Sequence, residues 1–138
     1  MSKIYYKLFY HIVWSTHLHY PEITEEVEKY LYPFLENKSK RFGCSLIAVG
    51  GTQDHIHLAI IIPPSESVAD IIGKLKGSST YFLNKELNIT KDFSWQTGYG
   101  VLSFAEKDLG RIVGYINNQK LHHLENKLNS KMEITEED

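Results

Sequence analysis

Two histidines, His55 and His57, alternate within an apolar run that ends at Pro63-Pro64. Side chains alternate across a β-strand, so both rings would lie on one face of a single strand. Two imidazoles held side by side can bind a divalent metal ion. Ala59 excludes a third alternating histidine. A His-x-His pair alone is more often incidental than a metal site, so this pair needs further ligands.

Tyr115 and Gln119 are four residues apart in a segment with helical periodicity, so their side chains would address the same point in space. Two imidazoles and one amide oxygen would hold a divalent ion, Mg²⁺ or Mn²⁺, with positions left open for a phosphate. Tyr115 would then be a nucleophile toward phosphorus. A phenol of pKa ~10 is ionised to roughly one part in a thousand at neutral pH, so it needs a nearby cation or base. Taken alone, Tyr115 is also explained by core packing.

The elements that position these groups follow from hydrophobic periodicity. Strands are predicted at 3–16, 44–51, 55–62 and within 93–104, and helices at 23–43, 67–87 and 105–129. A tight turn at Gly50-Gly51 would join the second and third strands into a hairpin. This order is the α+β, ferredoxin-like βαββαβ plan with an additional C-terminal helix that carries the tyrosine. Such a sheet leaves one face free, and the histidines would line that face.

Local signals refine the helix ends. Thr24 is a predicted N-cap and Gly43 a predicted stop for the first helix, in which Pro33 should cause a kink or an interruption. Ser103 and Glu106 form a capping-box pattern that would start the last helix. Asp54 could orient a ligand histidine, but strand alternation would point it away, so a turn role is preferred.

The chain of 138 residues fits one domain, predicted at 1–130 with an acidic tail at 131–138. No apolar run approaches the ~20 residues of a membrane span, and the single Cys44 excludes an internal disulfide, so we expect a cytoplasmic protein. The net charge of −2 is unevenly distributed. Residues 22–36 and 133–138 hold nine of the 17 acids and one of the 15 Lys and Arg residues, which leaves the rest of the chain basic.

A basic face on this part of the chain could bind nucleic acid. Phosphate contacts are expected from cations on the two later helices, and base stacking from aromatic residues near the fourth strand. A solvated helix face is the alternative for the cations, and core packing is the alternative for the aromatics. His122 could instead tune Tyr115 or cap the end of the last helix. The predicted DNA-binding residues are Arg111, Lys74, Lys76, Trp95, Tyr99 and His122.

The segments "DHIHLAI", "WQTGYGVLS" and "YINNQKLHH", in this order and spacing, resemble the small single-tyrosine HUH transposases of bacterial insertion sequences. The resemblance extends over about residues 5–123. It implies a metal-dependent enzyme that cuts single-stranded DNA beside hairpins, forms a 5′-phosphotyrosine intermediate and rejoins strands. By matching position, His55, His57 and Gln119 would be the metal ligands and Tyr115 the nucleophile. The family usually acts as a homodimer whose active sites are completed in trans.

Two features depart from that family's pattern. His17, His19 and Tyr20 stand where many relatives carry Arg or Lys, and Gly110 and Gly114 lie within the tyrosine helix. One hypothesis is that the two glycines ease movement of that helix between subunits. Two other functions remain open: a non-catalytic ferredoxin-like nucleic-acid-binding module, and a domesticated nickase of single-stranded DNA.

Overall fold

The computed structural model describes residues 3–124 and 132–133, and only the backbone of 122–124. Four strands and four α-helices make up this part of the chain. In chain order they are β1 (Phe9–Ser15), α1 (Glu25–Arg41), β2 (Ser45–Gly51), β3 (His55–Ile61), α2 (Val68–Tyr81), β4 (Gly100–Phe104), α3 (Leu109–Asn117) and α4 (Gln119–Leu124).

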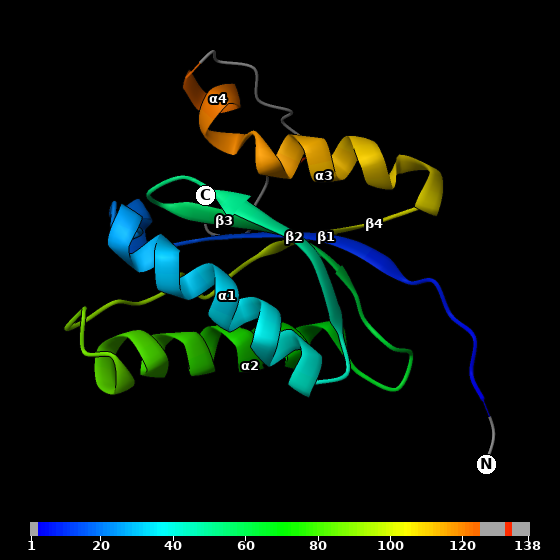
Figure 1. Cartoon of the computed structure of the whole chain (residues 1–138), viewed down its shortest axis with the longest axis horizontal. Helices are drawn as coiled ribbons and strands as arrows, with labels where there is room; N and C mark the ends of the chain where they lie inside the picture. The colour runs from blue at the N-terminus through cyan, green and yellow to red at the C-terminus, as the bar shows by residue number, and fades with distance from the viewer. Residues whose placement is uncertain (1–2, 125–131, 134–138) are drawn as a thin grey trace.

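The strands form one antiparallel sheet in the order β2-β3-β1-β4. Helices α1 and α2 cover one face, and α3 and α4 lie over the other (Figure 1). This arrangement confirms the predicted ferredoxin-like α+β fold with a C-terminal helix.

Strand β3 is buried on both faces of the sheet. Ile56, Leu58 and Ile60 point into the main core beneath α1 and α2, where they are fully buried. Ala59 belongs to the second apolar cluster, on the α3 face, and His55 and His57 share that face by alternation. The α3 cluster comprises Ala48, Ala59, Ile112, Tyr115, Ile116 and Met132. The histidines therefore line the face that the C-terminal helices cover.

Helix α1 begins and ends where the sequence predicts. The Thr24 hydroxyl accepts a hydrogen bond from the backbone N–H of Val27 at 3.2 Å, and Gly43 follows the helix with a φ of 79°. The predicted interruption at Pro33 is wrong, because the helix continues through it. Pro33 lies on the exposed side. There the carbonyl that its ring deprives of a partner can bind water.

The β2–β3 hairpin is confirmed, but its turn is at residues 52–54 and not at Gly50-Gly51. Both glycines are paired within β2, where other chain segments approach closely. A Cβ on Gly50 would lie 2.2 Å from the Ile116 carbonyl oxygen of α3, and one on Gly51 would lie 2.1 Å from the His55 carbonyl oxygen. The glycines therefore allow α3 and the turn to approach the strand.

The predicted first strand is too long. β1 begins at Phe9, which pairs with Ile61 of β3 and Phe104 of β4. Beyond this point the Leu8 carbonyl still accepts a hydrogen bond from the Ile62 N–H at 3.3 Å, and Pro63-Pro64 then ends the ladder on the β3 side because proline has no N–H to donate.

The predicted capping box is also wrong, and the last helix is not continuous. Ser103 pairs with Tyr10 in the sheet, and a 3₁₀ turn at Glu106–Asp108 precedes α3. Asn118 separates α3 from α4 with a φ of −109° and a ψ of 24°. Its side-chain amide donates to the Gly114 carbonyl at 2.8 Å, which stabilises the end of α3.

Among the described residues, no helix is long and apolar enough to cross a membrane. From the predicted tail, the structure describes Met132 and Glu133. Met132 is buried in the α3 cluster. The division of the chain at residue 130 stays a prediction.

Candidate active site

The two histidines of β3 present their Nε2 atoms to side chains from the C-terminal third of the chain. His55 Nε2 lies 3.2 Å from the amide oxygen of Gln119. His57 Nε2 lies 3.0 Å from Oε1 of Glu133, which is also 3.5 Å from His55 Nε2. Four donor atoms from three separate segments therefore converge on one point.

Tyr115 reaches the same point from α3. Its hydroxyl donates a hydrogen bond to Oε2 of Glu133, and its ring centroid lies 5.8 Å from that of His57. Gln119 is the first residue of α4, and its amide nitrogen donates to the Tyr115 carbonyl at 3.4 Å. Although the helix breaks at Asn118, this hydrogen bond keeps Gln119 beside Tyr115.

The convergent atoms fit a divalent cation. His55, His57 and Glu133 each offer a ligand atom, and these atoms lie within 4.8 Å of one another. Ligands that bind an ion at ~2.0–2.2 Å sit roughly 3 Å apart when adjacent, as the Nε2 and Oε1 atoms do here. Gln119 adds a fourth ligand atom, its amide oxygen. Two imidazoles with two oxygens suit a borderline or hard divalent ion.

Other side chains form hydrogen bonds with the Nδ1 atoms of both histidine rings. His55 Nδ1 lies 2.9 Å from the Asp54 carboxylate and 2.9 Å from the Thr52 hydroxyl, which itself donates to Asp54 at 3.1 Å. His57 Nδ1 lies 2.8 Å from Nε2 of His11. Asp54 therefore does more than the turn role preferred from the sequence, because its carboxylate also contacts His55. Asp54 precedes the strand, so strand alternation does not fix its direction.

Burial and charge oppose each other in this cluster. Burial lowers the pKa of His55, but hydrogen bonds to Asp54 and Gln119 and the charge of Glu133 outweigh it and raise the pKa above its ordinary value. Burial raises the pKa of Glu133, but its bonds to His57 and Tyr115 lower it overall. The hydrogen bond to His55 lowers the pKa of Asp54.

His11 behaves in the opposite way to His55. Burial, followed by the charge of His57, lowers its pKa to about 4. Its ring is therefore neutral at physiological pH.

The predicted phosphate contacts are dispersed over the molecule. Arg111 is exposed on α3, on the same face as the cluster, with Asp108 4.0 Å away. Lys74 lies on α2, across the sheet, with its ammonium 5.3 Å from the Phe42 ring centroid. Lys76 donates to the carbonyls of residues 96 and 98 at 2.9 and 2.8 Å. Lys76 therefore ties this loop to α2, and its role as a phosphate ligand stays a prediction.

The aromatic residues near β4 pack against the main core. Trp95 is buried, and its indole N–H donates to the Ser79 hydroxyl at 2.9 Å. Its stacking on bases stays a prediction. Tyr99 is half-buried against the main core, 5.7 Å from the Lys76 ammonium. The His122 side chain lies outside the described part of the chain, so its prediction stays untested.

His11 and Glu133 were not among the residues predicted from the sequence. His11 had a signal, because it is a polar residue within the apolar run of β1. Glu133 had none, because it lies 76 residues from His57 in an acidic segment without periodicity.

Comparison with known proteins places this geometry in a family. The model of the family described as "Transposase IS200 like" matches residues 4–119, which include both histidines, the tyrosine and the glutamine. The chain belongs to the IS200-like transposases. This confirms the resemblance found in the sequence.

Individual relatives agree with this assignment. The IS200-like transposase is 27% identical to the ISDra2 transposase TnpA of Deinococcus radiodurans over 120 residues, which cover 83% of this chain and 85% of the relative. A crystal structure of a protein from D. radiodurans R1, described as a candidate transposase, matches 92% of this chain and 98% of its own, with a TM-score of 0.69 and 25% identity. A REP-associated tyrosine transposase bound to a REP hairpin shares the fold, with a TM-score of 0.61, 13% identity and coverage of 93% and 76%.

Proposed function

We propose that this IS200-like transposase cleaves and rejoins single-stranded DNA at hairpin-flanked ends through a 5′-phosphotyrosine intermediate, with Mg²⁺ or Mn²⁺ as the cofactor. One observation carries the proposal: the Tyr115 hydroxyl and the Nε2 atoms of His55 and His57 meet on the carboxylate of Glu133. A nucleophile and a cation site are thus within reach of one phosphate. The relative solved with a DNA hairpin supports hairpin DNA as the partner.

In the cleavage step, Tyr115 Oη attacks phosphorus, the Oη–P bond forms and the P–O3′ bond breaks. The 3′ oxygen leaves with a proton from water, and the 5′ phosphate remains on the tyrosine. The phenolic proton passes to Oε2 of Glu133, which already accepts the Tyr115 hydrogen bond. Attack by a 3′-OH on the phosphotyrosine reverses these bonds and joins the strands.

The metal ion would be held by His55, His57 and Gln119, the set expected from the sequence, together with Glu133. When bound, it polarises the scissile phosphate and stabilises the charge that develops on its oxygens. The sequence had predicted a site without a carboxylate. Glu133 would remove one positive charge from that site, and the three other donors are neutral.

A cleft beside the cluster would accept the DNA strand. It has a volume of 410 Å³ and lies between β4 and α3, where Leu102, Phe104, Arg111 and Ile112 are among its lining residues. Arg111 is the predicted DNA ligand whose position suits this role, because its guanidinium is exposed at the cleft and can pair with a phosphate.

The proposed enzyme acts as a homodimer in the cytoplasm. In the chain described here, Tyr115 and Gln119 approach the histidines of their own β3, which is a cis arrangement. The trans arrangement proposed for the dimer would place α3 and α4 of one subunit against β3 of its partner with the same contacts.

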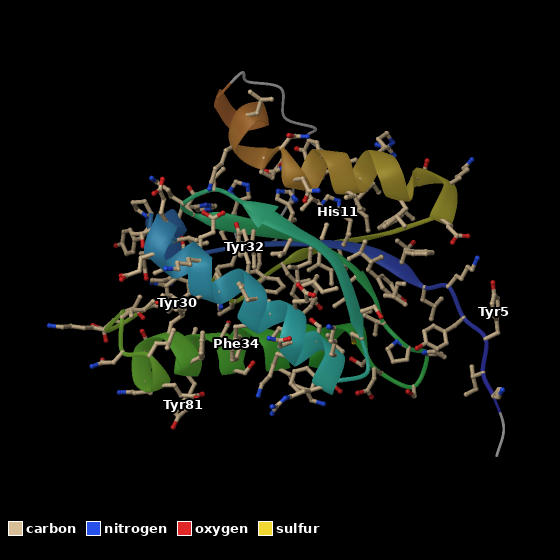
Figure 2. The ribbon with its side chains drawn as sticks, in the orientation of Figure 1. Tyr5, His11, Tyr30, Tyr32, Phe34 and Tyr81 are labelled. Atoms are coloured by element: carbon tan, nitrogen blue, oxygen red, sulfur yellow. The ribbon has the colours of Figure 1, made fainter. Side chains whose placement is uncertain are left out.

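Covalent trapping tests the proposal. The protein is incubated with a single-stranded DNA hairpin and Mn²⁺, and denaturing electrophoresis then shows whether a protein–DNA adduct survives. The wild type should give an adduct, and Tyr115→Phe should give none. Tyr30→Phe is the matched control, because Tyr30 is an exposed tyrosine of α1, remote from the cluster (Figure 2). A non-catalytic binding module would retain the hairpin without an adduct in any variant.

A further inference from the structure

His11 is a buried polar residue that the proposed chemistry does not use. It comes from the middle of β1 and lies between the sheet and α3, with 3% of its surface exposed (Figure 2). Its Nε2 atom is 2.8 Å from Nδ1 of His57. Its ring centroid lies 5.0 Å from that of His57 and 6.4 Å from that of Tyr115.

The chemistry of imidazole fixes the direction of this hydrogen bond in the metal-bound state. A histidine binds a metal through a nitrogen that carries no proton. If His57 binds through Nε2, the atom that faces Glu133 and His55, its Nδ1 must carry the ring proton. That proton can only be donated to an acceptor, and the atom at 2.8 Å is His11 Nε2. His11 must then be neutral with its own proton on Nδ1.

We propose that His11 is a positioning residue that sets the tautomer and ring orientation of His57 for metal binding. The proposal rests on the metal site of the proposed function. His55 is held differently, because the carboxylate of Asp54 and the Thr52 hydroxyl face its Nδ1. The two ligands would therefore be oriented by an anion at the solvent edge of the site and by a neutral ring in its interior.

The buried position explains why a neutral partner stands at residue 11. His57 is fully buried, whereas Asp54 beside His55 keeps 38% of its side chain exposed. A carboxylate at the depth of His11 would carry a desolvation cost that an imidazole avoids. Removal of the group that accepts the proton of a metal-bound histidine typically weakens metal affinity by roughly 10- to 100-fold.

If the role of His11 were purely structural, it would only provide a hydrogen-bond partner for the buried Nδ1 atom of His57 beneath α3. That role and the positioning role differ in what they do to metal affinity. We therefore place the test on metal binding, measured without DNA, since a loss of cleavage activity could also come from the contact with Tyr115.

The experiment titrates Mn²⁺ into the full-length protein and follows the free ion by electron paramagnetic resonance. Nitrogen-15 NMR of the Zn²⁺-loaded protein gives the tautomer of His57. His11→Phe keeps the ring volume and removes the acceptor, and His11→Gln returns an acceptor. His17→Gln is the matched control, because His17 is an exposed histidine outside the cluster.

We expect His11→Phe to weaken Mn²⁺ binding on the order of 10- to 100-fold. His11→Gln should recover most of the affinity, and His17→Gln should bind as the wild type does. NMR should show the Nδ1–H form of His57 in the wild type and in His11→Gln. If His11→Phe does not fold, His11→Asn replaces it, because the shorter amide withdraws the acceptor but stays polar, and it should also lose affinity.

Wild-type affinity in a folded His11→Phe or His11→Asn variant would overturn the proposal. So would an Nε2–H form of His57 in the Zn²⁺-loaded wild type. Failure of the proposed function would look different: metal binding would still depend on His11, but no covalent DNA adduct would form.

Discussion

At the scale of single residues, the cluster contains histidines whose pKa values are displaced in opposite directions. The pKa of His11 is lowered from 6.5 to about 4. Between these two pH values, His11 is protonated in the unfolded chain but neutral in the folded chain. Its contribution to stability therefore falls as the pH falls through this window. The raised pKa of His55 gives a contribution that is complete below 6.5 and is lost only at higher pH, as the pH rises through the folded value.

This difference distinguishes His11 from His55 in the metal-free protein. From pH 6.5 to about pH 5, the free energy of unfolding should fall by up to roughly 1.4 kcal/mol per pH unit in the presence of a chelator. His11→Gln should flatten this slope. Urea denaturation at several pH values measures it. Glu133 does not interfere, because its contribution is lost only as the pH falls through a pKa below 4.5. Equal slopes for both proteins would show that His11 is not the group responsible.

The second residue-scale prediction concerns Glu133. If its carboxylate accepts the Tyr115 proton and binds the cation, Glu133→Gln should slow adduct formation on the order of 100-fold and weaken Mn²⁺ binding. Rapid-quench trapping and Mn²⁺ titration measure these effects separately. Faster adduct formation in the variant, with unchanged metal affinity, would instead mean that Glu133 occupies the place of the phosphate.

Residues within regular elements were the predictable part of the site. Strand alternation placed His55 and His57 on one face, and helical spacing placed Tyr115 beside Gln119. Glu133 could not be predicted, because its contact with His57 joins residues 76 positions apart and follows neither strand nor helix spacing. His11 could have been found, since a histidine in a strand otherwise filled by residues such as Ile12 needs a polar partner.

At the scale of elements, the two glycines of α3 can be tested as a pair. A Cβ on Gly110 or Gly114 would meet nothing within 4 Å, so alanine fits both sites. The double alanine variant should raise the free energy of unfolding by about 1 kcal/mol per site. If the glycines ease movement of the tyrosine helix, strand transfer should fall although cleavage persists. Joined and cleaved DNA products measured together show this.

Gly73 and Gly77 of α2 provide the control, because alanine also meets no atom there. Their double alanine variant should be stabilised to a similar extent and transfer strands as the wild type does. Unchanged strand transfer in the α3 variant would rule out the movement hypothesis.

Gly50 sets the distance between β2 and α3. Gly50→Ala would place a methyl group 2.2 Å from the Ile116 carbonyl oxygen, so the backbone must shift. We expect a loss of about 2–3 kcal/mol of stability. The neighbouring Tyr115 should move away from His57, with slower adduct formation. Thermal unfolding and trapping measure these effects. A fully active variant would show that α3 does not need this close approach.

The errors at this scale come from local signals that tertiary contacts override. Ser103 matches a helix cap, but its backbone pairs with Tyr10 at the sheet edge, and a residue in a strand ladder cannot cap the following helix. Pro33 matches a helix breaker, but its position on the exposed side of α1 tolerates the missing bond. Element types and order were predictable because periodicity extends over many residues, whereas such boundaries depend on one or two.

At the scale of the whole molecule, the cis and trans arrangements differ in which subunit supplies the tyrosine. Tyr115→Phe lacks the nucleophile and His55→Ala lacks a proposed metal ligand, so each alone should form no adduct. If α3 exchanges between subunits, as the proposed dimer requires, co-refolded mixtures should regain part of the activity, up to about one quarter of the wild type by random pairing. Trapping with labelled DNA measures it. No recovery in a proven mixed dimer would favour the cis arrangement of the chain described here.

The double burial of β3 links correct folding to chemistry. A slip of one position along its neighbours would turn isoleucines toward the ligand cluster and imidazoles into hydrocarbon. Such a misregistered chain would forfeit core packing and catalytic competence together. A chain that folds stably with a slipped β3 but lacks the histidine site is therefore energetically disfavoured.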